Sequence, residues 1–431
     1  MKYFEHYSNS AFLNLDSMRK VQTQLLRQHL TYCQSASLFY RKLFKKHGIV
    51  PRQVNVDNLR DIPLTDKHFL SRSNDAFIAI PQECVADIVL SSGTTGDPTR
   101  IVYSRRDLLR LAYNERQSLM SCGITARDRV LLTCTIDRCF IAGLAYYSGA
   151  QAIGAACIRN GLNSLESHAG IIKLMAPSVI IGVPSFLRKL GTFVHNKKIS
   201  VRSVKKLVCI GEPLRDKDMK SLVVTRDIEN IWGAKAYSTY SSSEIVTTFC
   251  ECDRQNGGHL HPELAIVEIV DERGRQERTG VVGELVVTPL AIEGMPLVRY
   301  RTGDISFMME EPCPCGRKSP RLGPILGRKK QMLKIKGTTV YPLAVYSALD
   351  ELSEVSDYYM TVSSQDTLSD RLTVIVSLRH SCPVSRISEA LAAHLRVAPE
   401  VVIASEEEVR RVVYNPSLRK PVRFFDRRKQ I

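Results

Sequence analysis

The stretch LSSGTTGDPT, from Leu90 to Thr99, is the most informative motif of the sequence. It begins at the end of an apolar, β-branched run, Ile88 to Leu90, which predicts a buried strand. A loop of small and hydroxyl-bearing residues after a strand can surround phosphates with N–H and O–H donors, because glycine lets the backbone approach closely. The Gly-Lys-Ser/Thr ending of a Walker A loop is absent, which disfavours a P-loop nucleotidase. Taken alone, such a loop is more often a structural turn than a phosphate site.

Around this loop, apolar runs typical of strands alternate with stretches of helical periodicity. The strand-like runs are 130–132, 179–182 and 207–210, and the helical stretches between them include 106–120 and 164–174. Strands that alternate with helices predict an α/β sheet with functional loops at the strand ends.

The pattern then changes twice along the chain. After about Cys250, the runs 265–270 and 282–287 predict paired antiparallel strands. Near Gly327 a basic connector leads into a last segment with strand-like runs at 358–362 and 371–376 and a helical run at 384–395. We expect a large N-terminal domain over 1–327, a hinge at 328–331 and a small α+β domain over 332–431.

Composition fits a globular protein with anionic partners. The 431 residues predict two to four domains at roughly 100–200 residues each. Apolar residues make up 44% and charged residues 24%, which are ordinary values. Lysine and arginine outnumber aspartate and glutamate 60 to 44, so the net charge is +16. This balance favours nucleic acid, a membrane surface or phosphorylated small molecules, and a solvated basic surface is the alternative.

The sequence also indicates the cellular location of the protein. The first residues lack the apolar core of a signal peptide. The longest uncharged run, 139–158, contains three glycines and polar residues, so we expect a buried segment of a globular fold and no membrane partner. Twelve cysteines without a secretory signal indicate a reducing cytosol, where cysteines are packed, catalytic or metal-bound. We therefore expect a cytoplasmic protein.

Four further stretches follow the first loop in a specific order. They are GEP at 211–213, YSSSE at 240–244, YRTGD at 300–304 and the basic stretch 327–337. Together with the loop they resemble the adenylate-forming superfamily of acyl-CoA synthetases, and most closely its phenylacetate-CoA ligases. The resemblance spans the whole chain. It implies a large multi-sheet α/β adenylation domain followed by a small mobile α+β domain.

The same resemblance implies an activity. Enzymes of this family join a carboxylate to the α-phosphate of ATP, release pyrophosphate, and pass the acyl group from AMP to coenzyme A. We therefore expect ATP, Mg²⁺ and coenzyme A as cofactors and an aromatic, phenylacetate-like acid as substrate. The branch is often dimeric, which makes a homodimer an expectation too.

The resemblance assigns five residues to this chemistry. Two anions meet in the first step, so a cation must offset their charge, and that role falls to Lys420. Glu244 would hold Mg²⁺ as a hard oxygen ligand, and Ser243 would donate to the α-phosphate. Tyr240 would lie on the adenine, and Asp304 would accept hydrogen bonds from the ribose hydroxyls.

The other ATP and AMP contacts implied by the resemblance come from the loops and the hinge region. They are Ser91, Ser92, Gly93, Thr94, Thr95, Gly96, Gly211, Glu212, Pro213 and Arg328. Lys330 falls where the family pivots its small domain, so that the catalytic lysine can leave before coenzyme A enters. The chain departs from the superfamily at Ser241, where glycine is frequent, and at Thr99, where lysine is common.

The sequence identifies the residues of the acid pocket less specifically. By resemblance this pocket lies beside the strand and helix that follow the phosphate loop, which makes Asp137, Phe140, Gly143 and Tyr237 candidates. Phe140 and Tyr237 would suit a flat aromatic acid, whereas Asp137 hints at a polar substituent. Each of them can equally be a core, surface or helix-cap residue.

Cysteines and histidines form a separate candidate metal site. The cluster 250–261 and the pair Cys313 and Cys315 together offer more than the four S or N ligands that tetrahedral zinc requires. Some phenylacetate-ligase relatives carry a Cys, His, Cys, Cys site. That match selects Cys252, His259, Cys313 and Cys315, with Cys250 and His261 as alternates. This zinc would be structural; reduced cysteines with no metal are the alternative.

Three alternatives to the ligase remain open at this point. An adenylating enzyme can hand its acyl group to a carrier protein or an amine, and a degenerate relative can bind ATP without turnover. A zinc-containing nucleic-acid-binding protein would explain the charge and the Cys/His cluster. The basic residues, however, gather near the expected hinge and Lys420, and there is no basic stripe with interleaved aromatic residues. We therefore expect small-molecule partners and no nucleic acid.

Overall fold

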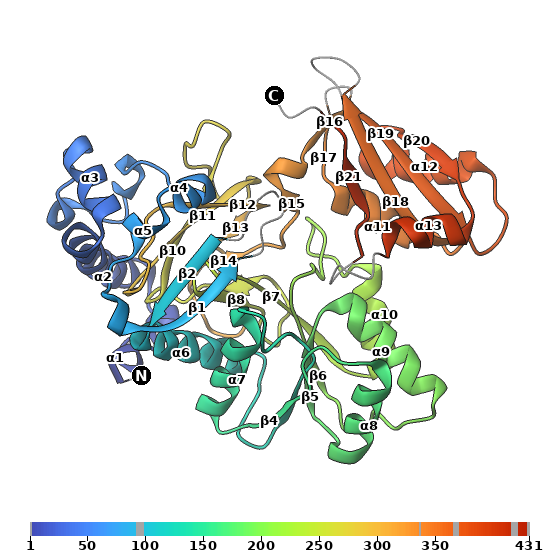
Figure 1. The fold of residues 1–431 in the computed structure, drawn as a ribbon, viewed down its shortest axis with the longest axis horizontal. Coiled ribbons are helices and arrows are strands. Elements are labelled where there is room, and N and C mark those ends of the chain that lie inside the picture. The colour runs from blue at the N-terminus through green and yellow to red at the C-terminus, as the bar shows by residue number, and fades with distance from the viewer. Residues whose placement is uncertain (1, 92–98, 336–337, 365–369, 415–420, 429–431) are drawn as a thin grey trace. The chain divides into compact units, whose positions relative to one another are not determined.

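The computed structural model describes the chain except for residues 1, 92–98, 336–337, 365–369, 415–420 and 429–431. The chain divides into two compact units, 1–325 and 326–431 (Figure 1). The sequence places the boundary two residues further on, after residue 327. Each unit has a hydrophobic core of its own. No helix among the described residues is both long enough and apolar enough to cross a membrane.

The first unit is built on a nine-stranded mixed sheet. Its strand order is β13-β14-β9-β8-β7-β6-β5-β3-β4. The parallel strands are β3 (Arg129–Leu132), β4 (Ala156–Arg159), β5 (Val179–Gly182), β6 (Lys206–Cys209) and β7 (Lys235–Ser242). The antiparallel ones are β8 (Thr247–Cys250), β9 (Gly258–His259), β13 (Met308–Met309) and β14 (Arg321–Leu322). The predicted α/β class is confirmed.

Helices cover both faces of this sheet because its buried strands are apolar on both sides. Leu131 and Ile180 face one helical layer, while Val130 and Ile181 face the other. The first layer consists of α8 (Leu165–Met175), α9 (Pro184–Asn196) and α10 (Val223–Trp232), and the second of α6 (Arg105–Ser121) and α7 (Ile141–Ile153). The uncharged run 139–158 forms α7 and β4, as expected for a segment of a globular fold.

A second, antiparallel sheet lies in the same unit. It contains β10 (Ala265–Val270), β11 (Gly283–Pro289) and β12 (Tyr300–Ser306). The predicted antiparallel pair is therefore confirmed. The N-terminal helices are α1 (Lys2–Glu5), α2 (Leu15–Ala36), α3 (Leu38–His47), α4 (Lys67–Arg72) and α5 (Asn74–Phe77).

The strand before the phosphate loop differs from the prediction. β1 (Val85–Ser91) pairs only with β2 (Thr99–Ser104), in a two-stranded antiparallel ribbon. Ile88 and Leu90 are each 42% exposed, so the expectation that 88–90 is a buried strand is wrong. The reason is that side chains alternate along a strand, and only one face of the ribbon meets the core.

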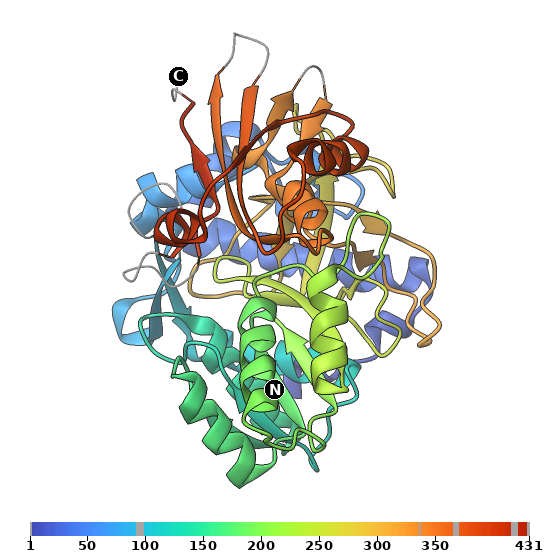
Figure 2. The ribbon, with the colours of Figure 1, turned by 90° about the vertical axis from the view of Figure 1, so that its right-hand side faces the viewer.

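The second unit is a small α+β fold. Its main sheet has the order β20-β19-β18-β21 and is flanked by a two-stranded ribbon, β16-β17. The strands are β16 (Leu333–Ile335), β17 (Thr338–Val340), β18 (Val355–Ser364), β19 (Asp370–Leu378), β20 (Glu400–Ile403) and β21 (Phe424–Asp426). The helices are α11 (Pro342–Asp350), α12 (Val384–Leu395) and α13 (Glu406–Val413). The first two pack on one face of the sheet and α13 on the other (Figure 2).

Helices α6 and α7 approach so closely that one position must be glycine. A Cβ added to Gly149 of α7 would lie 2.3 Å from the Cβ of Glu115 on α6. We expect Gly149→Ala to lower the free energy of unfolding by about 1–3 kcal/mol, because the helices must separate. Urea denaturation measures this change.

Gly170→Ala is the matched control, since a Cβ at this α8 glycine meets nothing within 4 Å. It should leave stability unchanged or raise it by about 1 kcal/mol through helix propensity. Equal effects of the two substitutions would contradict the close packing of α6 against α7.

Candidate active site

Two residues expected to bind the nucleoside come together from different sheets. The hydroxyl of Tyr240, on β7, donates to Oδ2 of Asp304, on β12, at 2.8 Å. Burial, and next the nearby Asp304 carboxylate, raise the pKa of Tyr240 well above its usual value, so the hydroxyl stays protonated and remains a donor. The Tyr240 ring also stacks on Phe249, at 6.2 Å between centroids. The ring and the carboxylate therefore form one fixed surface.

Ser243 and Glu244 follow β7 directly. The carbonyl of Ser243 accepts a hydrogen bond from the Tyr103 hydroxyl at 2.8 Å, which fixes the turn after the strand. The Glu244 side chain is 11% exposed, and its Oε1 lies 3.6 Å from Nζ of Lys67. This carboxylate is thus shielded from solvent and already beside a cation.

Lys67 is a residue that the sequence analysis missed. It is the first residue of α4, after the N-cap Asp66, and the backbone of Thr65 just before it bonds to Arg299 and Arg301 at the start of β12. Lys67 belongs to none of the motifs described above. A single lysine carries no sequence pattern of its own, so only the fold shows its proximity to Glu244.

The loop after β6 is held by its own acidic residue. The Glu212 carboxylate accepts hydrogen bonds from the backbone N–H of Ser185 at 2.9 Å and from its hydroxyl at 2.8 Å. Gly211 has φ +72°, a backbone conformation that favours glycine. The Glu212 side chain therefore binds the first turn of α9, which leaves the backbone around Gly211 and Pro213 as the part of this loop suited to a nucleotide.

The phosphate loop can be described only at its two ends. Ser91 and Thr99 are buried, and their hydroxyls have no hydrogen-bond partner within the described part of the chain. Hydroxyls in this position are suited to phosphate oxygens. The other predicted loop residues, and the predicted catalytic lysine, lie outside the described residues: Ser92, Gly93, Thr94, Thr95, Gly96 and Lys420. In the second unit, Arg328 in β15 (Gly327–Arg328) and Lys330 are both exposed.

The predicted pocket residues occupy different environments. Tyr237 is 3% exposed and belongs to the core beneath α7, whereas Asp137 is exposed and Phe140 half-buried on the loop before α7. Gly143 lies in the first turn of α7, and a Cβ there would be 2.2 Å from the carbonyl oxygen of Thr135. The close approach of α7 to this loop therefore requires glycine at 143.

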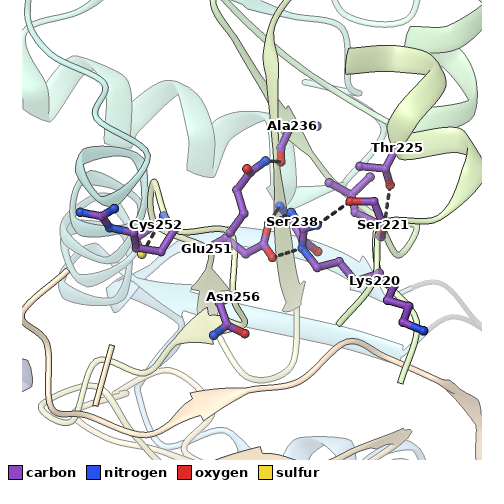
Figure 3. A network of polar contacts seen from close by, with 12 residues as sticks. Lys220, Ser221, Thr225, Ala236, Ser238, Glu251, Cys252 and Asn256 are labelled. Atoms are coloured by element: carbon purple, nitrogen blue, oxygen red, sulfur yellow. Dashed lines mark hydrogen bonds and ion pairs between the residues drawn. The ribbon is translucent and has the colours of Figure 1, made fainter. Parts of the chain in front are cut away.

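A buried ion pair connects the loop after β6 to the residue that follows β8. Arg215 donates to Oε1 of Glu251 from Nε at 2.6 Å and to Oε2 from Nη2 at 3.2 Å, and both side chains are almost fully buried (Figure 3). Oε2 also accepts the backbone N–H of Ser238 at 2.9 Å, and Arg215 reaches the Ser221 hydroxyl at 2.9 Å. The pair therefore fixes β7 at Ser238, which lies between the predicted site residues Tyr237 and Tyr240.

The four predicted zinc ligands lie together. The ligand atoms of Cys252, His259, Cys313 and Cys315 all fall within 4.8 Å of one another. Sγ of Cys252 is 3.7 Å from Sγ of Cys313, and Sγ of Cys315 is 3.5 Å from Nε2 of His259. Tetrahedral zinc with Zn–S about 2.3 Å and Zn–N about 2.0 Å sets these separations at about 3.8 and 3.5 Å. The donor set and its spacing therefore fit zinc.

Cys250 and His261, the alternate ligands, point to other partners. Sγ of Cys250 lies 3.3 Å from Sγ of Cys122 at the end of α6, and Nε2 of His261 lies 3.4 Å from the Ser118 hydroxyl. Both belong to a buried polar contact between α6 and the region of β8.

Two sequence matches show the family to which a chain with this fold belongs. Residues 28–290 match the family model of AMP-binding enzymes, and residues 337–428 match that of the AMP-binding enzyme C-terminal domain. The chain belongs to the AMP-binding enzymes.

Its relatives include several phenylacetate-coenzyme A ligases. That of Thermus thermophilus is 32% identical, over 84% of this chain and 82% of its own length. That of Pseudomonas putida is 29% identical, over 86% and 84%. The predicted family is thereby confirmed.

Solved structures agree on the fold. A 2-hydroxyisobutyryl-CoA ligase in its postadenylation state, in complex with R3-HIB-AMP, superposes with a TM-score of 0.84 at 20% identity, over 97% of this chain and 91% of that one. ATP-bound MatB from Rhodopseudomonas palustris gives a TM-score of 0.59 at 18% identity, over 76% and 66%. The adenylate-forming fold predicted from the motifs is thus confirmed.

The buried ion pair yields a prediction of its own. Glu251→Ala leaves the Arg215 guanidinium buried without its carboxylate, so we expect the free energy of unfolding to fall by about 3–5 kcal/mol. Chemical denaturation measures the change. Asp227→Ala, which removes the exposed partner of Arg188, should cost at most about 1 kcal/mol. If the two variants are equally stable, the Glu251 pair does not hold the sheet as described.

Proposed function

We propose that this chain is an ATP- and Mg²⁺-dependent acid:CoA ligase. It activates a carboxylic acid as the acyl-adenylate and then transfers the acyl group to coenzyme A. The observation that carries the proposal is the contact between Tyr240 and Asp304 beside Ser243 and Glu244, in a chain that belongs to the AMP-binding enzymes. The names of its relatives support an aromatic, phenylacetate-like acid as substrate.

The nucleoside end of the site is already organised. The adenine would lie against the ring of Tyr240, and Asp304 would accept hydrogen bonds from the ribose hydroxyls. The Tyr240 hydroxyl holds the Asp304 carboxylate at 2.8 Å, so the carboxylate need not reorient when the ribose arrives. Arg328 would contribute a further contact, as the resemblance to the family implies.

The phosphate end depends on charges that offset one another. Glu244 would ligate Mg²⁺, which would screen the charge of the triphosphate. The Glu244 carboxylate lies 3.6 Å from the ammonium group of Lys67, so Mg²⁺ and Lys67 would compete for this carboxylate. Lys67 would then turn to the phosphate oxygens, while Ser243 donates to the α-phosphate.

The acid and the α-phosphate repel each other as they approach. We assign the compensating charge to Lys420, whose ammonium group can contact oxygens of both. The small domain would pivot at Lys330 after adenylation, so that this lysine leaves and the coenzyme A thiol reaches the acyl carbonyl. Asp137, Phe140, Gly143 and Tyr237 remain the proposed surroundings of the acid.

We also propose a structural zinc ion at Cys252, His259, Cys313 and Cys315. Their spacing supports this site, since four protein ligands complete a tetrahedron and leave no position for water. The ion would supply a cross-link between the segment after β8 and the loop that contains Cys313. We also propose a cytoplasmic location and a homodimer, both as expected from the sequence.

Acid-dependent release of pyrophosphate from ATP tests the ligase. With a panel of aryl and alkyl acids, wild-type protein should release pyrophosphate with at least one acid, and Lys420→Ala should lower this rate by about 100-fold or more because a transition-state charge is lost. Coenzyme A and a phosphopantetheine carrier protein, added in parallel, distinguish the two thiol acceptors. If the protein binds ATP but releases no pyrophosphate with any acid, the proposed ligase function is wrong.

Metal analysis tests the zinc site independently of activity. Purified protein should hold one zinc per chain, and Cys313→Ser should lower both the zinc content and the melting temperature. Cys84→Ser, at an exposed cysteine, should change neither. A metal-free protein whose melting temperature does not respond to added zinc would refute the site.

A further inference from the structure

One arginine ties together the two described ends of the chain around the predicted catalytic lysine. The segment 415–420 lies outside the described residues, but the residues on either side of it are bonded to each other. The backbone N–H of Val422 donates to the carbonyl of Val413 at 2.9 Å. Nη2 of Arg423 lies 3.5 Å from the hydroxyl of Tyr414. The chain is therefore held on both sides of the segment.

Arg423 in turn is bound to the middle of the domain. Its Nη2 and Nε donate to Oδ1 of Asp357, on β18, at 2.7 and 3.2 Å. Its guanidinium lies 5.1 Å from the centre of the neighbouring Tyr358 ring, and the Tyr358 hydroxyl donates to Asp350 of α11 at 2.8 Å. The arginine is 25% exposed and the aspartate 14%, so solvent screens this pair only in part. A planar guanidinium can bind a carboxylate through the N–H groups at its edge while its face lies on a ring, a geometry that the compact ammonium group of lysine reproduces only in part.

The strand that follows is too short to fix the chain alone. β21 has three residues, Phe424–Asp426, and pairs with β18 only over 360–362. The carbonyl of Arg423 accepts the backbone N–H of Met360 at 2.7 Å, immediately before that pairing begins. Arg423 therefore marks the point at which the chain leaving residue 420 becomes attached to the sheet.

We propose that Arg423 is a positioning residue for the adenylation step. Only Pro421 and Val422 separate it from Lys420, and proline fixes its own φ angle, so the link is short and stiff. By binding Asp357 and Tyr358, Arg423 sets where the lysine ammonium can meet the carboxylate and the α-phosphate. This inference rests on the proposed function and adds to it a residue that acts through Lys420.

The role predicts a difference between the two half-reactions. A displacement of about 1 Å in a catalytic group can cost about 100-fold in rate. The lysine acts in acyl-adenylate formation and withdraws before thioester formation. Loss of Arg423 should therefore slow the first half-reaction and leave the second nearly unchanged, whereas disruption of the whole domain would impair both.

The experiment measures each half-reaction on the full-length protein. Pyrophosphate release is followed with the best acid of the panel, and thioester formation with the corresponding synthetic acyl-adenylate and coenzyme A. Arg423→Met keeps an unbranched apolar stem and removes the charge and the N–H donors of the guanidinium group. We expect it to lower the kcat of adenylation by about 30–100-fold and thioester formation by less than about threefold. Arg423→Lys should recover part of the adenylation rate.

Two further variants keep the test decisive. Arg386→Met removes an arginine from an ion pair with Glu354 elsewhere in the same unit, and both of its half-reactions should match wild type. If Arg423→Met does not fold, Asp357→Asn replaces it, because it removes the charge that Arg423 binds and should show the same selective loss.

The outcomes separate this inference from the function on which it rests. If wild-type protein and Arg423→Met adenylate the acid at the same rate, the role of Arg423 is wrong and the proposed function stands. The same conclusion follows if Arg423→Met slows both half-reactions equally. No adenylation by wild-type protein with any acid overturns the proposed function, and the role of Arg423 with it. A loss confined to adenylation, with partial recovery in Arg423→Lys, supports both.

Discussion

The hydrogen bond between Tyr240 and Asp304 joins two sheets of the fold. Tyr240 lies near the end of a strand of the nine-stranded sheet, and Asp304 lies on a strand of the antiparallel sheet, 64 residues later in the chain. Because both residues are fixed in their strands, the register of each sheet sets the shape of the proposed nucleoside site. The site is thus a consequence of how two sheets meet, and a shift of either strand by one residue would separate the pair.

Buried charges maintain that register. The pair Arg215 and Glu251 ties β7 to the loop after β6, and Arg299 and Glu268 form a second buried pair beside β12. Each guanidinium donates in parallel to the carboxylate or to nearby carbonyl groups, which satisfies its hydrogen-bonding capacity. Such pairs contribute little net stability compared with apolar packing, but a misaligned strand would leave a charge unpaired. They favour one arrangement of the strands over its neighbours.

Local patterns predicted the elements well and their surroundings less well. Apolar periodicity predicted the α/β class, the antiparallel pair of β10 and β11 and the strands of the small domain, because each depends on neighbours in sequence. The same pattern could not show that Ile88 lies on the open face of a two-stranded ribbon, since exposure depends on which strands pair. Resemblance selected the four S and N ligands that the fold brings together, while the roles proposed for Lys420 and the phosphate loop stay predictions.

The residues that sequence reasoning missed share one property. Lys67 approaches Glu244 from 177 residues away, and Asp357 precedes Arg423 by 66. A single lysine or arginine in a basic chain has no local signature, so its partner appears only in the folded structure. Pairs of this kind neutralise basic side chains that sequence alone would assign to solvent.

The glycine at 143 limits how the proposed acid pocket can change. With a carbonyl oxygen 2.2 Å from where a Cβ would stand, the first turn of α7 cannot accept a side chain without moving the loop before it. Libraries designed to broaden acid preference therefore gain nothing by varying this position. The half-buried Phe140, on the loop that Gly143 holds in place, can change size with the helix backbone left where it is. Diversity in the pocket would accordingly evolve at the loop while the helix start stays constant.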